Sequence, residues 1–516
     1  MSKAFYITTP IYYVNDKPHI GHAYTTIACD VLARFKRLDG YSVKFLTGTD
    51  EHGQKVAKAA AEKGIQPIEL CNQNSKNFND LAVTLGISND DFIRTTEDRH
   101  VKSCQALWKR IEDNGHIYLD KYAGWYAVRD EAYYDESELT KGPNGERLAP
   151  TGAPAEWVEE ESYFFDLSKW QYKLLAFYDA NPDFIGPKTR FNEVYSFVKG
   201  GLKDLSISRT TFSWGIPVPG NEKHVMYVWI DALQNYQTAL GFPNQDGEYA
   251  TYWPAAHHVV GKDIIRFHCV YWPAFLMAAG LELPKRVFAH GWWTVEGQKM
   301  SKSLGNAIDP TVLVEKYGLD QLRYFMMREI PFGNDGDFSE DAIAGRINGE
   351  LANEFGNLAQ RVLSFIAKNC SGKVPPFGEF TDEDNALTAQ SRDLVAECRA
   401  AIEKQAFHEV LEIIWRCVRA ANGYVDKEAP WSLRKTDPDR MDTVLYVLVS
   451  VLRNLAIMMQ PFTPDAASKM LDQLGVPSDN RSFEFFANNW LKPDTSLPAP
   501  QGVFPRYDAN AGKENA

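Results

Sequence analysis

Two short segments of the chain combine residue types that suit phosphate chemistry. The first is His19-Ile20-Gly21-His22, which follows a short apolar run and opens a stretch of helical periodicity. A helix N-terminus offers unpaired N–H groups and the positive end of a dipole, and both favour a phosphate. Gly21 lets the backbone approach a ligand closely, and two imidazoles one turn apart can donate hydrogen bonds as charge builds in a transition state. Taken alone, the segment also fits a turn with two unrelated histidines.

The second segment is a basic loop that is expected to follow a strand. It reads Lys299-Met300-Ser301-Lys302-Ser303 and continues with Leu304-Gly305-Asn306. Two ammonium groups on a loop rich in Gly and Ser can reach a triphosphate and neutralise a departing pyrophosphate. Taken alone, such a loop is more often only a solvated turn. The occurrence of both segments in one chain is therefore the stronger indication of phosphate chemistry.

The elements that must hold these segments alternate between strand and helix. Ala4–Thr9 and Val43–Thr47 are β-prone runs, and helical periodicity extends from about His22 to Leu38 and from about Gly53 to Glu62. This start predicts a parallel sheet with helices on its faces. Three later runs are expected to be further strands: Met226–Ile230, His258–Gly261 and Val287–His290.

The chain as a whole predicts an α/β fold with a Rossmann-like, doubly wound parallel sheet. Dense aromatics and turn signals indicate a β-rich insertion that splits the sheet, and helical periodicity from about Asn348 indicates an all-α helical bundle, with Thr381–Asp384 expected in a loop. The predicted ranges are 1–115 and 225–295 for the two halves of the sheet domain, 116–224 for the insertion, 296–347 for a connector that holds the basic loop, 348–490 for the bundle and 491–516 for an extended tail.

The composition is that of an ordinary globular protein. The 516 residues are 44% hydrophobic and 24% charged, and 55 Lys and Arg against 68 Asp and Glu give a net charge of −13. That charge argues against a protein that coats nucleic acid through bulk basicity, yet it leaves room for local basic contacts. The 7 cysteines form no C-x-x-C pair, and no basic-then-apolar leader or run of about 18 apolar residues is evident. We therefore expect a cytoplasmic protein with reduced thiols and no membrane partner.

Together, in this order on a split βα sheet, the two segments resemble the HIGH and KMSKS signatures of the class I aminoacyl-tRNA synthetases. The flanking sequences resemble the methionyl-tRNA synthetases within that class, from Tyr6 into the helical bundle. The resembling segments are Thr8–Asn15, Thr47–Gly53, Val228–Leu233 and Val260–His268. The resemblance implies a methionine–tRNA ligase that forms methionyl-adenylate from methionine and ATP and then charges the 3′ ribose of tRNA(Met), for both initiation and elongation.

Other members of the superfamily fit less well. A nucleotidylyltransferase carries an H-x-G-H loop but is usually shorter and lacks a helical module after the second motif. The stretch between His22 and Lys299 is too short for the large editing domain of valyl, isoleucyl or leucyl enzymes. A cysteinyl enzyme needs thiolate-selective zinc ligands, which are not evident. A non-catalytic tRNA-binding or chaperone-like relative is expected to have eroded signatures, and both are intact here.

The resemblance implies a role for individual residues in the activation step. The implied catalytic residues are His19, His22, Lys299 and Lys302, and the implied ATP contacts are His19, Gly21, His22, Gly261, Asp263 and Lys302. The implied methionine pocket comprises Ile11, Tyr13, Asp50, Trp229, Ala232, Leu233, Tyr236, Ile264 and His268. The chemistry agrees, because a thioether packs well on aromatic rings and a carboxylate suits the substrate ammonium. Tyr13 and His268 are the residues that we expect to supply a polar contact to the sulfur.

The helical bundle holds residues that suit base recognition. Asn353, Asn357 and Arg361 are spaced by four, and because each step advances about 400° they share one helix face within about 80°. Two amides and a guanidinium can bind the edges of unstacked bases, and Trp431, which we expect in a loop after a helix, can stack on one. Each pattern alone also fits a solvated helix face or a buried tryptophan, but the resemblance assigns both to the tRNA anticodon. Nearby Arg434, Lys435 and Arg440 are candidate phosphate contacts.

The sequence departs from many family members in lacking the C-x-x-C pairs of a zinc knuckle, and we expect no appended dimerising domain of the kind that some members carry. Residues 116–224 contain no cysteine, whereas tetrahedral zinc needs four Cys or His ligands in close array. His257 and His258 are adjacent and therefore point to opposite faces of a strand, so a metal there is not expected. We predict no structural zinc, Mg²⁺ only with ATP, and a monomer whose partners are L-methionine, ATP and initiator and elongator tRNA(Met).

Overall fold

The computed structural model describes residues 3–15, 17–143, 145–295, 297–299, 308–486 and 491–509. The chain divides into two compact units. Unit 1 comprises Met1–Lys3, His19–Val43 and Gly291–Ala516, and unit 2 comprises Ala4–Pro18 and Lys44–His290. The helix that follows the first signature therefore belongs to the same unit as the C-terminal helices, although it lies early in the sequence.

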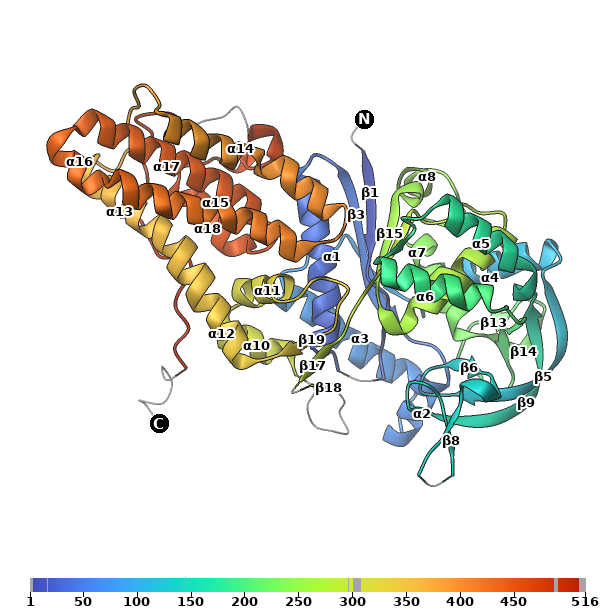
Figure 1. Ribbon diagram of the computed structural model, residues 1–516. Helices are drawn as coiled ribbons and strands as arrows, with labels where there is room; N and C mark the ends of the chain where they lie inside the picture. Colours follow the sequence, from blue (N-terminus) through green and yellow to red (C-terminus); the bar gives the residue numbers. More distant parts are fainter. Residues whose placement is uncertain are drawn as a thin grey trace. The chain divides into compact units, whose positions relative to one another are not determined.

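Unit 2 is built on a parallel sheet (Figure 1). The strand order is β10-β16-β15-β1-β3-β2, with β4 beside β3, and the strands are β1 (Ala4–Thr8), β2 (Tyr12–Tyr13), β3 (Ser42–Asp50), β4 (Asp91–Arg94), β10 (Ile185–Gly186), β15 (Ala256–Gly261) and β16 (Arg286–His290). Tyr6 pairs in parallel with Ala256, and His258 pairs with Val287. Sequence reasoning placed β1, β15 and β16 within two residues, and the doubly wound parallel sheet is confirmed.

Helices pack with this sheet in unit 2 and contribute many buried residues. They include α2 (Gln54–Lys63), α3 (Pro67–Thr84), α4 (Asp98–Asp113), α7 (Val228–Thr238), α8 (Glu248–Tyr252) and α9 (Trp272–Ala278). The expectation of a strand at Met226–Ile230 is wrong: β14 (Asn221–Met226) ends there and α7 begins at Val228. Every residue of α7 is buried, and a short apolar run with no exposed face gives no periodicity that would separate a strand from a buried helix.

The segment predicted as a β-rich insertion holds two kinds of structure. Its first part is an antiparallel sheet led by β5 (Ile117–Ala127) and β9 (Pro154–Phe165), with β6 (Ala132–Tyr134), β7 (Thr140–Lys141), β8 (Arg147–Leu148) and β11 (Leu205–Ser206). Its middle part is helical, with α5 (Gln171–Ala180) and α6 (Lys188–Lys199), and β10 between them pairs with β16 of the parallel sheet. Three short strands, β12 (Ser208–Arg209), β13 (Pro217–Val218) and β14, complete it.

Unit 1 begins with α1 (Ile20–Leu38) and continues after the parallel sheet. A small sheet, β18-β17-β19, comes first, with β17 (Trp293–Val295), β18 (Gln298–Lys299) and β19 (Gly336–Phe338). The helices are α10 (Pro310–Tyr317), α11 (Leu319–Arg328), α12 (Glu340–Arg346), a π-helical segment (Ile347–Gly356), α13 (Asn357–Asn369), α14 (Asp382–Ile402), α15 (Phe407–Glu428), α16 (Pro430–Thr436), α17 (Pro438–Met459) and α18 (Pro464–Gln473). The predicted all-α bundle is thus confirmed (Figure 1).

Two details of the bundle differ from expectation. Thr381–Asp384 does not lie in a loop: Thr381 is the N-cap of α14, and its hydroxyl and the Asp384 side chain form a capping box. α17 is long and apolar enough to cross a membrane by length and composition, although Arg453 interrupts its apolar run in the sequence. Within the protein 94% of its most apolar stretch is buried. It is the central helix of the bundle, packed against α14, α15, α16 and α18.

Candidate active site and anticodon-reading surface

The carboxyl ends of the parallel strands gather the candidate methionine and ribose residues of unit 2. β3 ends at Asp50, β15 ends at Gly261, and the chain leaves β1 just before Ile11. Asp50 pairs in register with Tyr13 of the short strand β2. Ligands in open α/β sheets bind outside this edge, where the strand order reverses. In unit 2 the reversal lies between β1 and β15, because the chain continues from β1 to β3 on one side and from β15 to β16 on the other.

The predicted methionine residues form one apolar assembly in unit 2. Trp229, Ala232, Leu233 and Tyr236 belong to its main hydrophobic core, and Ile11, Tyr13 and Ile264 pack against that core from partly buried positions. Trp229 stacks on Phe267, with ring centroids 3.8 Å apart and planes 12° apart. Sequence reasoning missed Phe267, because nothing in its spacing separates it from an ordinary core residue. The residues predicted to bind methionine thus include both aromatic side chains, such as Trp229 and Tyr236, and aliphatic ones, such as Leu233.

Asp50 supplies a carboxylate that is prepared for a cation. It is only 2% exposed, and its Oδ1 has no hydrogen-bond partner among the residues that the structure describes. Burial, together with the nearby carboxylates of Asp231 and Glu131, raises the pKa of Asp50 well above its usual range. A buried acid in that state gains from a cationic partner, because an opposite charge offsets desolvation. The substrate ammonium fits this requirement.

Tyr236 and His268 form a fixed polar pair behind the apolar surface. The His268 Nδ1 lies 3.0 Å from the Ile264 carbonyl oxygen and its Nε2 lies 2.6 Å from the Tyr236 hydroxyl. Burial lowers the pKa of His268 to about 4, so the ring is neutral at pH 7. Because a carbonyl only accepts, Nδ1 must carry the proton, and the Tyr236 hydroxyl then donates to Nε2. Both nitrogens of His268 are thus occupied, and Tyr236 is the group that His268 orients.

The first signature builds the N-terminus of α1 in unit 1. The Gly21 N–H donates to His19 Nδ1 over 3.1 Å, and the His19 N–H donates to His22 Nδ1 over 3.0 Å. A neutral imidazole that accepts at Nδ1 carries its proton on Nε2, so both rings present an Nε2–H. Burial and the neighbouring His19 lower the pKa of His22 well below its usual value. A Cβ on Gly21 would lie 2.9 Å from the His19 ring, which explains the need for glycine.

The two signatures are linked through the backbone of unit 1. The Ile20 N–H donates to the carbonyl of Ile308 over 3.1 Å, and Ile308 follows the basic loop. Lys299 ends β18 and pairs with Thr294 of β17. Lys302 lies outside the described residues, so its role remains a prediction. The α1 N-terminus is thereby joined to the segment that closes the second signature.

Gly261 ends β15, and Asp263 follows it closely. A Cβ on Gly261 would approach the Asp263 Oδ1 to 2.6 Å, so a side chain there would displace the carboxylate. Asp263 sits in the single 3-10 turn Lys262–Ile264 at the strand end. A carboxylate at this edge is suited to accept hydrogen bonds from ribose hydroxyls.

The residues predicted to read the anticodon lie on the helices of unit 1. Asn353 lies in the π-helical segment, Asn357 and Arg361 lie in α13, and both asparagines are exposed. Trp431 is 45% exposed on α16, not in a loop as expected, and the Arg361 guanidinium lies 5.5 Å from the centroid of its ring. The Asn353 side-chain oxygen accepts a hydrogen bond from Arg506 of the C-terminal tail, a contact that sequence reasoning missed.

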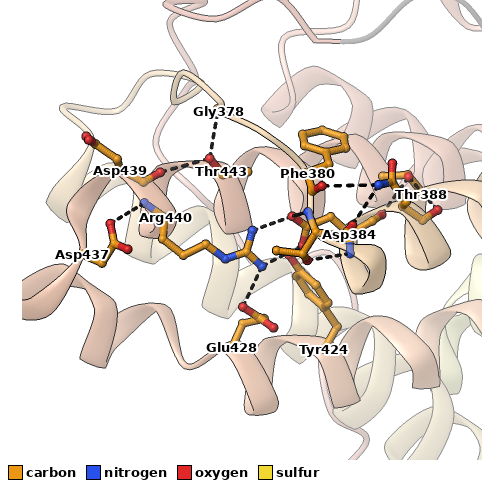
Figure 2. Close-up of polar contacts among 12 residues, drawn as sticks. Gly378, Phe380, Asp384, Thr388, Tyr424, Glu428, Asp437, Asp439, Arg440 and Thr443 are labelled. Carbon is orange, nitrogen blue, oxygen red and sulfur yellow. Dashed lines mark hydrogen bonds and ion pairs between the residues drawn. The ribbon is translucent and has the colours of Figure 1, made fainter.

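Arg440 is engaged in an ion-pair network rather than directed at phosphate (Figure 2). Its Nη2 donates to Asp384 Oδ1 over 2.8 Å and to Glu428 Oε2 over 2.7 Å, and the Tyr424 hydroxyl donates to the same Asp384 oxygen over 2.6 Å. The side chain of Arg440 is 17% exposed and that of Asp384 is 0% exposed. Arg440 therefore ties α14, α15 and α17 together beside the turn at Ala429, which corrects its interpretation as a phosphate contact.

One group of three side chains in the described part of the chain has the composition of a metal site. His100, Cys104 and Asp231 are buried, and their ligand atoms lie within 4.8 Å of one another. The His100 Nε2 and Asp231 Oδ1 are 2.8 Å apart, which is a hydrogen-bond distance. The group offers N, S and O donors, whereas Mg²⁺ prefers oxygen ligands, so it does not fit the Mg²⁺ expected with ATP.

Comparison with known proteins places this fold and these motifs in a class. Residues 5–363 match the family model described as tRNA synthetases class I (M), and residues 374–511 match the anticodon binding domain of methionyl tRNA ligase. The sheet with its two signatures thus defines a class I aminoacyl-tRNA synthetase. The chain belongs to the methionyl-tRNA synthetase family, whose members are methionine–tRNA ligases.

Individual relatives match over nearly the whole chain. The methionine–tRNA ligase of Mesorhizobium japonicum is 58% identical over 98% of this chain and 98% of its own length, and that of Rickettsia felis is 56% identical over 99% and 100%. A solved structure of Mycobacterium tuberculosis methionyl-tRNA synthetase in complex with methionyl-adenylate has a TM-score of 0.96 and 54% identity, covering 98% of this chain and 100% of its own. The prediction of the family is confirmed.

Proposed function

We propose that the chain activates methionine with ATP and transfers it to tRNA(Met), with the residues named above in the roles that follow. The observation that carries the proposal is the buried Asp50 carboxylate, whose register partner Tyr13 packs against the hydrophobic core that includes Trp229 and Leu233 in unit 2. An amino acid with an ammonium group and an unbranched, polarisable thioether satisfies both features. The proposal assigns the ammonium to Asp50 and the side chain to the surface made by Trp229, Leu233 and Tyr236.

The first step joins methionine to the adenylyl group of ATP. A carboxylate oxygen of methionine attacks the α-phosphorus of ATP, a new P–O bond forms, and the bond to the bridging oxygen of pyrophosphate breaks. The residues proposed to act on the phosphates are His19, His22, Lys299 and Lys302. The imidazole Nε2–H groups donate to phosphate oxygens as negative charge develops, and the lysines neutralise the departing pyrophosphate. Little covalent chemistry is asked of the protein, so positioning and charge stabilisation dominate.

The second step transfers the aminoacyl group. A hydroxyl of the terminal ribose of tRNA attacks the acyl carbonyl, its proton is lost, and AMP leaves with the electron pair of the broken C–O bond. Asn353, Asn357, Arg361 and Trp431 are proposed to read the anticodon. Because the proposed readers lie in the anticodon module, initiator and elongator tRNA(Met) with the same anticodon are expected to be charged alike.

Further features of the proposal concern cofactors and state. Mg²⁺ is proposed to arrive with the nucleotide phosphates, which supply the oxygen ligands that it prefers. We propose a cytoplasmic monomer without structural zinc. Metal analysis after purification in chelator tests the last point, and near-stoichiometric zinc would contradict it.

The deciding experiment is ATP–pyrophosphate exchange with the twenty amino acids offered singly. Exchange is expected with methionine alone. Exchange with another amino acid at a comparable rate, or none with any, would refute the proposal. Aminoacylation of tRNA(Met) by the same preparation then tests the second step separately.

A further inference from the structure

Asp231 occupies the centre of a buried polar network on the far side of α7 from the methionine residues. At about 100° per residue, Trp229, Ala232, Leu233 and Tyr236 span an arc of about 100°, and Asp231 lies on the opposite side. Asp231 is fully buried. Burying a carboxylate costs folding free energy unless the carboxylate is fully paired. The partners of Asp231 therefore indicate its role.

Two imidazoles pair with the two oxygens of Asp231. His52 Nδ1 lies 2.8 Å from Oδ2, and His100 Nε2 lies 2.8 Å from Oδ1. Burial opposes ionisation of Asp231, but these two imidazoles outweigh it and lower its pKa to about 2. Since an ionised carboxylate only accepts, each ring must present an N–H to it. The carboxylate thereby joins three elements: α7, α4 and the end of β3.

The link to β3 reaches the proposed ammonium ligand. His52 lies two residues after Asp50, and its backbone N–H faces the Asp50 carboxylate. The side chain of His52 is 8% exposed and that of Asp231 is 1% exposed, so solvent does not compete strongly for the hydrogen bond. Moving α7 along its axis would therefore pull on His52 and on the segment that holds Asp50.

The link to α4 fixes the other side of α7. His100 Nδ1 lies 3.1 Å from the hydroxyl of Thr238, which is about two turns beyond Asp231 on the same helix. Gln234 Nε2 donates to Ser103 Oγ over 2.8 Å in the same interface. The Gln234–Ser103 bond joins the two helices without reaching His52, which makes it a natural control.

We propose that Asp231 is a positioning residue that sets the distance between the ammonium ligand Asp50 and the thioether-binding face of α7. The bridge from His52 through Asp231 makes the two ends of the amino-acid site one rigid unit. The site therefore selects amino acids by the length of their side chains. The inference rests on the proposed methionine activation and adds to it a residue that touches no substrate. It also assigns the His100–Cys104–Asp231 group to hydrogen bonding rather than to a metal.

The test compares Asp231→Asn and His52→Gln with the matched variant Ser103→Ala in the full-length chain. Pyrophosphate exchange is measured with methionine and with ethionine, whose side chain is one methylene longer. Both network variants are expected to raise the KM for methionine about tenfold, since a hydrogen bond to a charged group is lost. They are also expected to reduce the discrimination against ethionine about tenfold, since one methylene is worth that much in a fixed pocket. The KM for ATP is expected to stay within about twofold.

Ser103→Ala is expected to lower the thermal midpoint yet keep both the KM for methionine and the ethionine discrimination. If the network variants also lower only the midpoint, Asp231 is merely structural and the proposal is wrong. If Asp231→Asn does not fold, His52→Gln decides by the same two readouts. Near-stoichiometric zinc in the wild-type protein that is lost in Asp231→Asn would also overturn the proposal. A wild-type protein without methionine-dependent exchange would instead refute the proposed function, so the two failures are distinguishable.

Discussion

The guanidinium of Arg361 lies over the indole ring of Trp431, with its central carbon 5.5 Å from the ring centroid. A second contact holds the same guanidinium, whose Nη2 donates to Asp426 Oδ1 over 2.8 Å. The positive charge thus rests against a π-face, an arrangement that stabilises both groups. It presents an exposed indole from α16 beside the polar residues of α13, which is the pairing of stacking and hydrogen bonding that unstacked bases require.

Replacing Trp431 by Ala is expected to separate the two half-reactions. Methionine-dependent pyrophosphate exchange stays unchanged, because the bundle residue touches neither methionine nor ATP in the proposal. Aminoacylation loses roughly 1–3 kcal/mol in kcat/KM for tRNA, the worth of one base stack. Tyr172→Ala, which removes another highly exposed aromatic ring (79% exposed), is the control and leaves both reactions intact. Parallel loss of both reactions in Trp431→Ala would show that the indole is structural.

Replacing Lys302 by Ala is expected to slow activation while leaving methionine affinity nearly unchanged. The proposed contact to the leaving pyrophosphate strengthens only as charge develops, so its loss lowers kcat rather than raising KM. Single-turnover adenylate formation measures the effect, which we expect at roughly 2–4 kcal/mol. A wild-type rate of adenylate formation in the variant would show that Lys302 does not contribute to activation.

His268 gives the folded protein a pH dependence whose sign follows from its pKa. The group has a folded pKa of about 4 against about 6.5 for a free histidine, so the unfolded chain takes up its proton first as the pH falls. Its contribution to stability is therefore full above pH 6.5 and declines by about 1.4 kcal/mol per pH unit toward pH 4. Thermal midpoints of the wild-type protein and His268→Gln between pH 6.5 and pH 4 test this contribution. The midpoint of the variant is expected to fall less steeply as the pH decreases. Parallel midpoint curves for the two proteins would show that titration of His268 does not cause the pH dependence.

Arg323 and Arg34 share Asp30 and give a matched pair for stability. Arg323 Nη2 lies 2.6 Å from Asp30 Oδ2 and both side chains are 0% exposed, whereas Arg34 lies 2.7 Å away and is 28% exposed. Arg323→Met leaves a buried charge without its main partner and is expected to cost about 3–5 kcal/mol. Arg34→Ala removes a screened partner and is expected to cost about 0–1 kcal/mol. Urea unfolding of both variants measures the difference, and equal losses would contradict the role of burial.

Sequence reasoning predicted the candidate site residues from local patterns, and it misassigned some of the elements that hold them. The signature histidines and the Asn353-to-Arg361 spacing are local patterns, and local patterns survive without knowledge of the fold. The elements are harder to read: the run that forms α7 favours a strand in the sequence, because a fully buried segment has no polar face to mark its period. The capping box at Thr381 had a readable signal, a Thr followed three residues later by an acid, that the acidic cluster obscured.

The network around Asp231 lay beyond the reach of sequence. His52, His100 and Asp231 are separated by long stretches of chain, and each alone is an ordinary buried polar residue. Only the packing of α4, β3 and α7 brings them together. Arg440 illustrates the converse, since a basic residue near an anticodon surface suggested phosphate, while the fold uses its charge to pair Asp384.

The placement of α1 in unit 1 has a practical consequence for dividing the chain into fragments. Arg323 holds Asp30 of α1 and also donates to the Pro461 carbonyl over 2.9 Å, and Lys36 and Asp39 form ion pairs with Glu403 and Arg399 of the bundle. A fragment that stops before the bundle would keep both signatures and Arg323 in its sequence, yet the helix behind the first signature would lose the ion pairs to Glu403 and Arg399. The compact units of this chain are defined by contacts between residues rather than by sequence order. Adding the bundle as a separate polypeptide is therefore expected to restore the activity of a catalytic fragment that lacks it.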